Sequence, residues 1–171
     1  MTDLVTLKSE DEGYVVHWGS NSVRCAVGRR GVGHKEREGD GVTPTGIWPL
    51  RRVLYRPDRQ SAPHTALPIS PITEDDGWCD APADENYNMA VKLPYPASAE
   101  ALWRADDLYD IVVVLGFNDA PVIAGKGSAI FLHVAARDFA PTEGCVALKK
   151  EKLLALLSEI SAGAKIRIES D

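Results

Sequence analysis

The chain has 171 residues, which is enough to bury a sizeable core without disulfides or metals, so we expect a single domain over residues 1–171. Its composition, 44% hydrophobic and 26% charged, is typical of a globular protein. The net charge of −6 argues against a nucleic-acid-binding protein, because such proteins usually carry a basic face.

Targeting signals are not evident in the sequence. No apolar run approaches the roughly 18 residues that a membrane span needs, so no membrane-spanning segment is expected. The first ten residues lack a basic region followed by an apolar one, and they do not read as a signal peptide. The chain is therefore expected to stay in the cytoplasm, to lack its leader here, or to be exported by another route. The odd number of cysteines, three, leaves at least one thiol outside any intramolecular disulfide.

Short strands are predicted along the first third of the chain. Residues 4–8 and 14–18 form a first pair of strands joined by a turn. Residues 22–27 alternate apolar and polar side chains, which is the period-2 pattern of a half-buried strand. A glycine-rich loop is expected over residues 28–46, and an extended segment follows over residues 46–55.

A long irregular segment follows. Residues 56–97 contain seven of the eleven prolines and no obvious element, which predicts a functional loop or lid. A short helix is predicted over residues 98–104, with Ser98 as its N-terminal cap. The apolar runs 111–115 and 129–134 predict two buried strands.

The last predicted helix covers residues 149–160, and Gly163 is expected to stop it. One face of this helix is apolar and carries Leu153, Leu156, Leu157 and Ile160. Residues 165–169 alternate and close the sheet. The predicted fold class is therefore mostly β (α+β), with one or two short helices and a long loop.

Cys145 is the candidate nucleophile and His133 its candidate base. A thiol becomes a good nucleophile when a nearby imidazole takes its proton. Gly144 lets the backbone turn tightly before the cysteine, which brings amide N–H groups close to a reacting carbonyl. If the following helix begins soon after Cys145, its positive end would also favour the thiolate. This pattern indicates acyl transfer through a thioester.

Simpler interpretations exist for both residues. A free cysteine is often a small buried apolar residue, and a core histidine often has its ring nitrogens satisfied by backbone groups. No metal site is expected, because the sequence lacks the ligand spacing that zinc sites show. The glycines of residues 28–33 resemble a phosphate loop only superficially, since no long helix follows. The chemistry needs only a thiol, an imidazole and amide donors, so we expect no cofactor.

Two motifs in this chain resemble those of a known family. They are Gly39-Asp40-Gly41-x-Thr43-Pro44-x-Gly46 and Thr142-Glu143-Gly144-Cys145-Val146, with a strand that ends in His133 between them. Together they resemble the YkuD-type L,D-transpeptidase catalytic domain over residues 15–168. That family has a β-sandwich-like fold and uses a cysteine to remodel peptidoglycan stem peptides. The resemblance implies that Cys145 is the nucleophile, that His133 is the base and that Gly144 supplies backbone to the site.

The sequence departs from the family pattern near the cysteine. Thr142 matches the usual hydroxyl position, but Glu143 is acidic and Ala147 occupies the place of an arginine. A substrate carboxylate then needs another partner, and Arg137 is the predicted replacement. The alternative is a solvent-facing arginine that pairs with Asp138 or Glu143. The divergence suggests that donor or acceptor choice differs, including attack nearer the first residue of the stem peptide.

Several aromatic and amide side chains are candidates for a substrate groove, because such groups suit sugars and peptides. These candidates are Trp78, Tyr87, Asn88 and Tyr109. For Trp78 and Tyr87 the alternative is that they pin a long loop to the core. Asn118 and Ser128 flank a glycine-rich turn and are either substrate ligands or turn residues.

The leading functional hypothesis is a peptidoglycan L,D-transpeptidase that forms 3-3 or 1-3 cross-links through a Cys145 thioester. Resolution of the same acyl-enzyme by water would make an L,D-carboxypeptidase or amidase. The alternatives from other classes are a non-catalytic peptidoglycan-binding module and an intracellular cysteine acyltransferase or peptidase. The expected partners are peptidoglycan stem peptides (muropeptides), the expected state is a monomer, and the resemblance implies the periplasm or cell envelope.

Overall fold

The computed structural model describes residues 1–170, and its strands and single helix account for 41% and 6% of the chain. The mostly-β prediction is therefore confirmed. The elements are β1 (Thr2–Glu10), β2 (Gly13–Trp18), β3 (Asn21–Arg24), β4 (Val32–Gly33), β5 (Thr43–Pro44), β6 (Gly46–Tyr55), β7 (Ile69–Pro71), β8 (Asp76–Cys79), β9 (Ala90–Lys92), β10 (Ala99–Ala101), β11 (Ile111–Leu115), β12 (Phe131–Val134), β13 (Val146–Leu148), α1 (Lys150–Glu159) and β14 (Ile160–Ile168).

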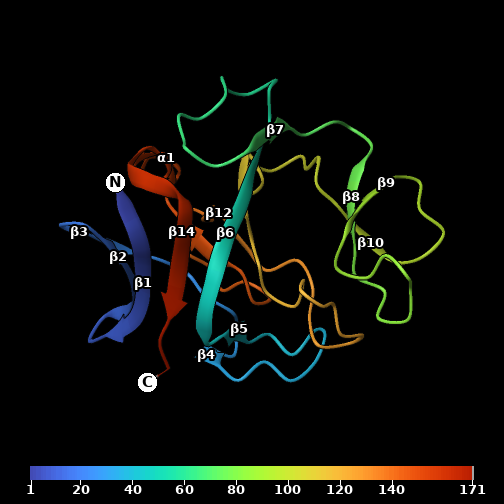
Figure 1. Cartoon of the computed structure of the whole chain (residues 1–171), viewed down its shortest axis with the longest axis horizontal. Coiled ribbons are helices and arrows are strands. Elements are labelled where there is room, and N and C mark those ends of the chain that lie inside the picture. Colours follow the sequence, from blue (N-terminus) through green and yellow to red (C-terminus); the bar gives the residue numbers. More distant parts are fainter. Residues whose placement is uncertain (171) are drawn as a thin grey trace.

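Nine strands form one large sheet, in the order β13-β12-β11-β6-β14-β1-β2-β3, with β7 paired to β6. Figure 1 shows β1, β14 and β6 running side by side, with the small sheet β10-β8-β9 on the far side of the molecule from β1. β1 and β14 pair in parallel although they lie at opposite ends of the sequence. The N-terminal and C-terminal strands are thus neighbours in the interior of the sheet.

The large sheet buries apolar side chains on both faces where β11 and β12 run. In β11, Ile111, Val113 and Leu115 belong to the main core, whereas Val112 and Val114 belong to a second core on the other face. This division follows from the alternation of side chains along a strand. β12 divides in the same way, since Leu132 and Val134 face the main core and Phe131 faces the second. His133 is placed by this alternation on the same face as Phe131.

The helix α1 covers the main core. Leu153, Leu156 and Leu157 are fully buried there, as the apolar face of the sequence predicts. Gly163 does not stop the helix, contrary to expectation. The chain becomes extended at Ile160 and runs directly into β14, where pairing with β1 and β6 holds it, and Gly163 lies inside that strand.

The prediction for residues 56–104 was wrong in two respects. The segment is not without elements, because it contains β7, β8 and β9. Residues 99–101 form β10 rather than a helix, and they pair with β8. The Ser98 hydroxyl donates to the Asp80 carboxylate instead of capping a helix. Cross-strand pairing and the burial of Leu102 outweigh the weak local helix propensity here.

The short parallel pair β4–β5 anchors the glycine-rich loop that precedes β6. This loop crosses the lower edge of the molecule in Figure 1. It meets the C-terminal part of the chain, because Gly28 and Thr142 form an isolated bridge and Ala26 and Ala147 form another. Residues near 28–43 and 142–147 are thereby brought together.

Within residues 1–170, α1 is too short and too polar to cross a bilayer.

Candidate active site

The edge pair β12–β13 brings the two predicted catalytic residues to one cavity. His133 pairs with Ala147, and Leu132 pairs with Val146, so Cys145 enters β13 beside Phe131. Cys145 and His133 both line a cavity of about 450 Å³. Cys145 is 9% exposed and His133 is 5% exposed, so each is reached only from that cavity.

The Cys145 thiol is held by backbone groups of the preceding strand. Its Sγ donates to the Ala129 carbonyl oxygen at 3.1 Å and accepts from the Phe131 N–H at 3.4 Å. Burial raises the pKa of the thiol to about 12, and the Glu100 carboxylate adds to the rise, while the Phe131 amide and Lys35 act against it. The Cys145 side chain at rest is therefore a neutral thiol.

The imidazole of His133 is oriented by its own strand. Its Nδ1 lies 2.8 Å from the Val134 carbonyl oxygen. Because a carbonyl only accepts, Nδ1 carries the proton, and Nε2 keeps a lone pair that can take another. Burial lowers the pKa of His133 to about 4. Tyr109 packs edge-on against the ring at 5.3 Å and restricts its rotation.

The Cys145 thiol and the His133 imidazole are both neutral at rest, and this determines which proton transfers they can make. An imidazole with a pKa of about 4 is unprotonated at neutral pH, so its lone pair is available, but the same low pKa makes it a weak base. A thiol with a pKa of about 12 is rarely ionised, so it needs a base when it attacks. The arrangement suits proton transfer coupled to attack, rather than a preformed thiolate–imidazolium pair. α1 contributes little to the thiol, because β13 separates its first turn from Cys145.

The turn that leads into Cys145 is tied together by hydroxyl groups. Thr142 Oγ1 donates to the Cys145 carbonyl oxygen at 2.6 Å and accepts from the Gly144 N–H at 3.1 Å. Thr43 Oγ1 donates to the Gly144 carbonyl oxygen at 2.8 Å and accepts from the Gly28 N–H at 2.8 Å. The two motifs are thus joined, because Thr43 belongs to the first and Gly144 to the second.

Position 144 requires glycine. Its φ is +143°, a conformation that residues with a β-carbon rarely adopt. A β-carbon there would lie 2.9 Å from the Val42 carbonyl oxygen and 3.2 Å from Ile130 Cδ1. The predicted role of Gly144 in shaping the turn therefore has a steric basis.

The cavity is lined by more acidic than basic side chains. Its charged residues are Lys35, Glu38, Asp80, Glu100, Arg104 and Glu143. Arg104 pairs with Asp106 at 2.6 Å, and Lys35 pairs with Asp40 at 2.6 Å. The Tyr109 hydroxyl donates to Glu100, whose pKa is raised by burial. Glu143 pairs with Arg29 at 3.1 Å, so Glu38 and Asp80 are the lining residues that give the cavity a negative charge.

The residues predicted for substrate binding fall into two groups. Tyr109, Ser128 and Thr142 line the cavity. Trp78, Tyr87, Asn88 and Asn118 are not among its lining residues.

Asn88 holds together the wall behind the cavity. Its side chain accepts from Trp78 Nε1 and from the Ala129 N–H, both at 3.0 Å. It also donates to the carbonyl oxygens of Phe117 and Asn118. Because its amide makes four hydrogen bonds within the protein, it positions the backbone of Ala129, which in turn contacts the Cys145 thiol.

The remaining members of this group are also occupied by protein contacts. The Tyr87 hydroxyl donates to Glu38 and accepts from the Gly127 N–H. Asn118 donates to the carbonyl oxygens of Ile123 and Gly127, which closes the turn before β12. Arg137 is exposed on the segment between β12 and β13, and it is not among the residues that line the cavity.

Sequence reasoning missed four charged residues of the cavity, namely Lys35, Glu38, Glu100 and Arg104. They lie in loops and in β10, where charged residues are usually solvated and give no sequence signal. The sequence offered one indication, because Lys35 lies just before the motif that begins at Gly39. Within residues 1–170, no three His, Cys, Asp or Glu side chains are grouped as a metal site needs.

Three comparisons with known proteins were made. Residues 4–168 match the family model described as the L,D-transpeptidase catalytic domain, YkuD. A comparison with curated protein sequences gives no match. Among solved structures, an L,D-transpeptidase from Mycobacterium smegmatis aligns with a TM-score of 0.46 and 11% identity over 99% of this chain, which spans 59% of that one. Because the family model covers nearly the whole sequence, the chain belongs to the YkuD family of L,D-transpeptidase catalytic domains.

Proposed function

We propose that this chain cross-links peptidoglycan stem peptides in the cell envelope, through a thioester on Cys145. The observation that carries the proposal is the shared cavity of Cys145 and His133, with the thiol held by backbone groups and the imidazole free at Nε2. Membership of the family supports the substrate class.

Acylation begins with both groups neutral. Nε2 of His133 takes the thiol proton as the sulfur of Cys145 attacks the carbonyl carbon at an L-centre of the donor stem. The carbon–nitrogen bond to the next, D-configured residue then breaks. His133 returns the proton to the departing amine, and a thioester remains on Cys145.

Deacylation reverses the roles. The amine of a neighbouring stem peptide arrives as an ammonium and first gives one proton to water. The neutral amine then attacks the thioester carbon, and His133 takes a second proton from it. The carbon–sulfur bond breaks, the proton returns to the sulfur, and a new amide joins the two stems. Attack by water at the same step would release an acid and make the chain a carboxypeptidase.

Charge on the carbonyl oxygen needs a donor during both steps. The Gly144 N–H already donates to Thr142 Oγ1. The Cys145 N–H is therefore the donor that we assign to the oxyanion. Thr142 fixes the direction of that amide, because it also holds the Cys145 carbonyl oxygen.

The acidic lining favours the amine-bearing partner. Glu38, Asp80 and Glu100 face a cavity whose two cations are paired with Asp40 and Asp106. Opposite charge raises the local concentration of a protonated amine and disfavours an anionic competitor. We infer that the acceptor amine approaches along this side.

The test is mass spectrometry of purified muropeptides after incubation with the protein. Products that join two stems support the proposal, and their mass and fragmentation distinguish 3-3 from 1-3 links. Products that are only shortened identify a carboxypeptidase, and unchanged muropeptides in the presence of folded protein contradict catalysis. Cys25→Ala is the matched control for Cys145→Ala, because Cys25 is also a free buried cysteine but lies in the main core.

A further inference from the structure

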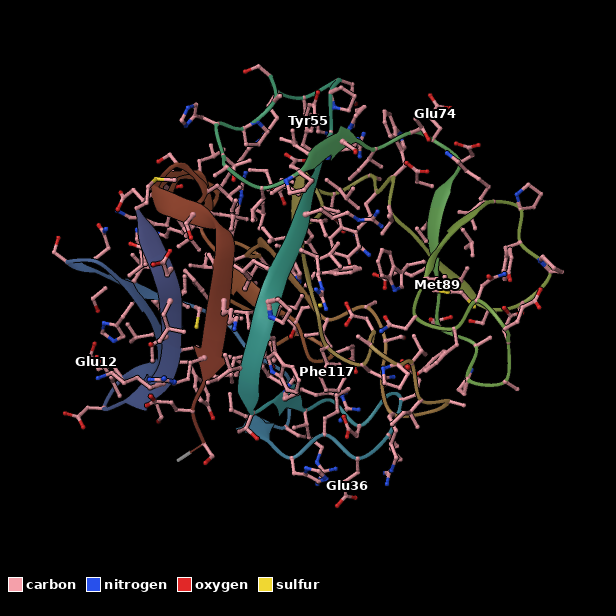
Figure 2. The ribbon with its side chains drawn as sticks, viewed as in Figure 1. Glu12, Glu36, Tyr55, Glu74, Met89 and Phe117 are labelled. Carbon is pink, nitrogen blue, oxygen red and sulfur yellow. The ribbon has the colours of Figure 1, made fainter. Side chains whose placement is uncertain are left out.

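A buried lysine lies beneath the turn that carries the nucleophile. The Lys35 side chain is only 3% exposed, although its neighbour Glu36 points out of the molecule at the lower edge (Figure 2). Its Nζ donates to Asp40 Oδ1 at 2.6 Å and to the Val42 carbonyl oxygen at 3.3 Å. The aliphatic stem packs against Gly127, where a β-carbon would lie 2.6 Å from Lys35 Cε.

Asp40 is built to keep this lysine in place. Its carboxylate accepts from the N–H groups of Glu36, Arg37 and Val42 as well as from Lys35. Burial alone would raise the pKa of Asp40, but Lys35 and the three amides outweigh it and lower the pKa to about 2. The pair is therefore ionised at neutral pH.

The ammonium lies one residue from the nucleophile. Nζ is 3.6 Å from the point where Gly144 would carry a β-carbon, and the Val42 carbonyl that it binds is 2.9 Å from the same point. Lys35 also lines the catalytic cavity. An ammonium has three N–H donors, and two are accounted for by Asp40 and Val42, so one is left for the cavity side.

We propose that Lys35, fixed by Asp40, stabilises the negative charge that Cys145 acquires when it loses its proton. This inference rests on the proposed role of Cys145 as nucleophile. A unit charge within a few ångströms of a partly desolvated sulfur acts strongly, because little water screens it. Burying an ion pair is costly, so a pair placed at this position is poorly explained by stability alone.

The titratable groups around the Cys145 sulfur shift the pKa of the thiol in different directions. Glu100 from β10 raises the pKa of the thiol, and Lys35 lowers it. Tyr109 from the segment before β11 and His133 from β12 complete the surroundings, and both are neutral at pH 7, since burial raises the pKa of Tyr109 and lowers that of His133. Lys35 is thus the cation that opposes Glu100.

The test measures alkylation of Cys145 by iodoacetamide from pH 7 to 10, with the modified residue identified by peptide mass spectrometry. Lys35→Met should slow alkylation of Cys145 at pH 8 by at least about tenfold, which corresponds to a rise of about one unit in the apparent pKa. Lys35→Arg should keep most of the rate. Asp40→Asn should accelerate it several-fold, because the ammonium loses its counter-charge. Lys165→Met removes an exposed lysine of β14 and should change nothing.

The opposite signs separate an electrostatic role from a structural one. If the pair only holds the loop, Lys35→Met and Asp40→Asn change the rate in the same direction, and the proposal is overturned. Unfolding would speed labelling of Cys25 and Cys79 as well, so a change confined to Cys145 excludes it. If Lys35→Met does not fold, Asp40→Asn decides alone, because an unchanged or lower rate contradicts the proposal. None of these measurements needs muropeptide turnover, so failure of the proposed cross-linking activity would be seen separately.

Discussion

Replacing His133 by alanine tests the central step of the mechanism. A pKa of about 12 for the Cys145 thiol leaves roughly one thiol in 10⁵ ionised at pH 7. A general base typically contributes about 10²–10⁴-fold to rate. His133→Ala should therefore slow acylation by about 10²–10⁴-fold at pH 7, while the fold is retained.

The pH profile makes this prediction sharper. In the wild type the imidazole is neutral from pH 6 upward, because its pKa is about 4, so the acylation rate should be nearly flat between pH 6 and 9. In His133→Ala only the thiolate reacts, and its fraction rises about tenfold per pH unit below the thiol pKa. The deficit should therefore shrink steadily as pH rises.

Thioester formation can be followed by quenching the reaction with acid and measuring the mass of the intact protein. A tetrapeptide stem serves as donor. His17→Ala is the matched control, because His17 lies on β2 and bonds Glu10, away from the cavity. Equal acylation rates at pH 7, or parallel pH profiles for wild type and His133→Ala, would remove His133 from the mechanism.

Four further results are expected. Cys145→Ala should abolish muropeptide turnover and keep the melting temperature within a few degrees, and retained turnover would disprove the thioester. Gly144→Ala should destabilise the fold by about 2 kcal/mol in urea titrations and lower turnover, because its β-carbon meets the Val42 carbonyl at 2.9 Å in a strained conformation. Arg137 is exposed and does not line the cavity, so it can bind only a carboxylate of the stem peptide that lies outside the cavity; Arg137→Ala should then raise the apparent KM for muropeptides without changing iodoacetamide labelling of Cys145, and an unchanged KM would show that Arg137 does not bind substrate. Finally, His133 has a pKa of 6.5 in the unfolded state and about 4 in the folded state, so the unfolded state binds a proton first as the pH falls. Acidification from pH 6.5 to 4 should therefore lower the free energy of unfolding of the wild type by up to about 3 kcal/mol. His133→Gln should not show this loss.

That Cys145 and His133 lie close together was predictable from the sequence, because its signals are local. An apolar strand that ends in His133 and a glycine before Cys145 both survive in the structure, and β12 and β13 bring them to one cavity. The strands of the large sheet were also predictable, because β6 and β11 carry clear apolar patterns.

The features that the sequence did not predict depend on residues that are far away in the sequence. β8 and β10 are only four and three residues long, and they depend on strand pairing, β8 with both β9 and β10, which no local pattern reveals. The sequence also does not show how Asn88 is held, because a polar side chain in a long loop gives no sign of the four backbone and side-chain partners that occupy it. The burial of Lys35 was not predicted either, because a lysine side chain is expected to be exposed to solvent unless its buried partner is known.

The neutral resting state of Cys145 has a consequence for the durability of the protein. Oxidants such as hydrogen peroxide attack the thiolate, and exposed thiols of low pKa are the first to reach sulfenic and sulfinic acids. A thiol that is 9% exposed, with a pKa raised to about 12, offers little of that form until a substrate carbonyl lies beside it. On the function proposed above, the Cys145 thiol would therefore survive exposure to oxidants better than an exposed thiol of low pKa until a substrate reaches it.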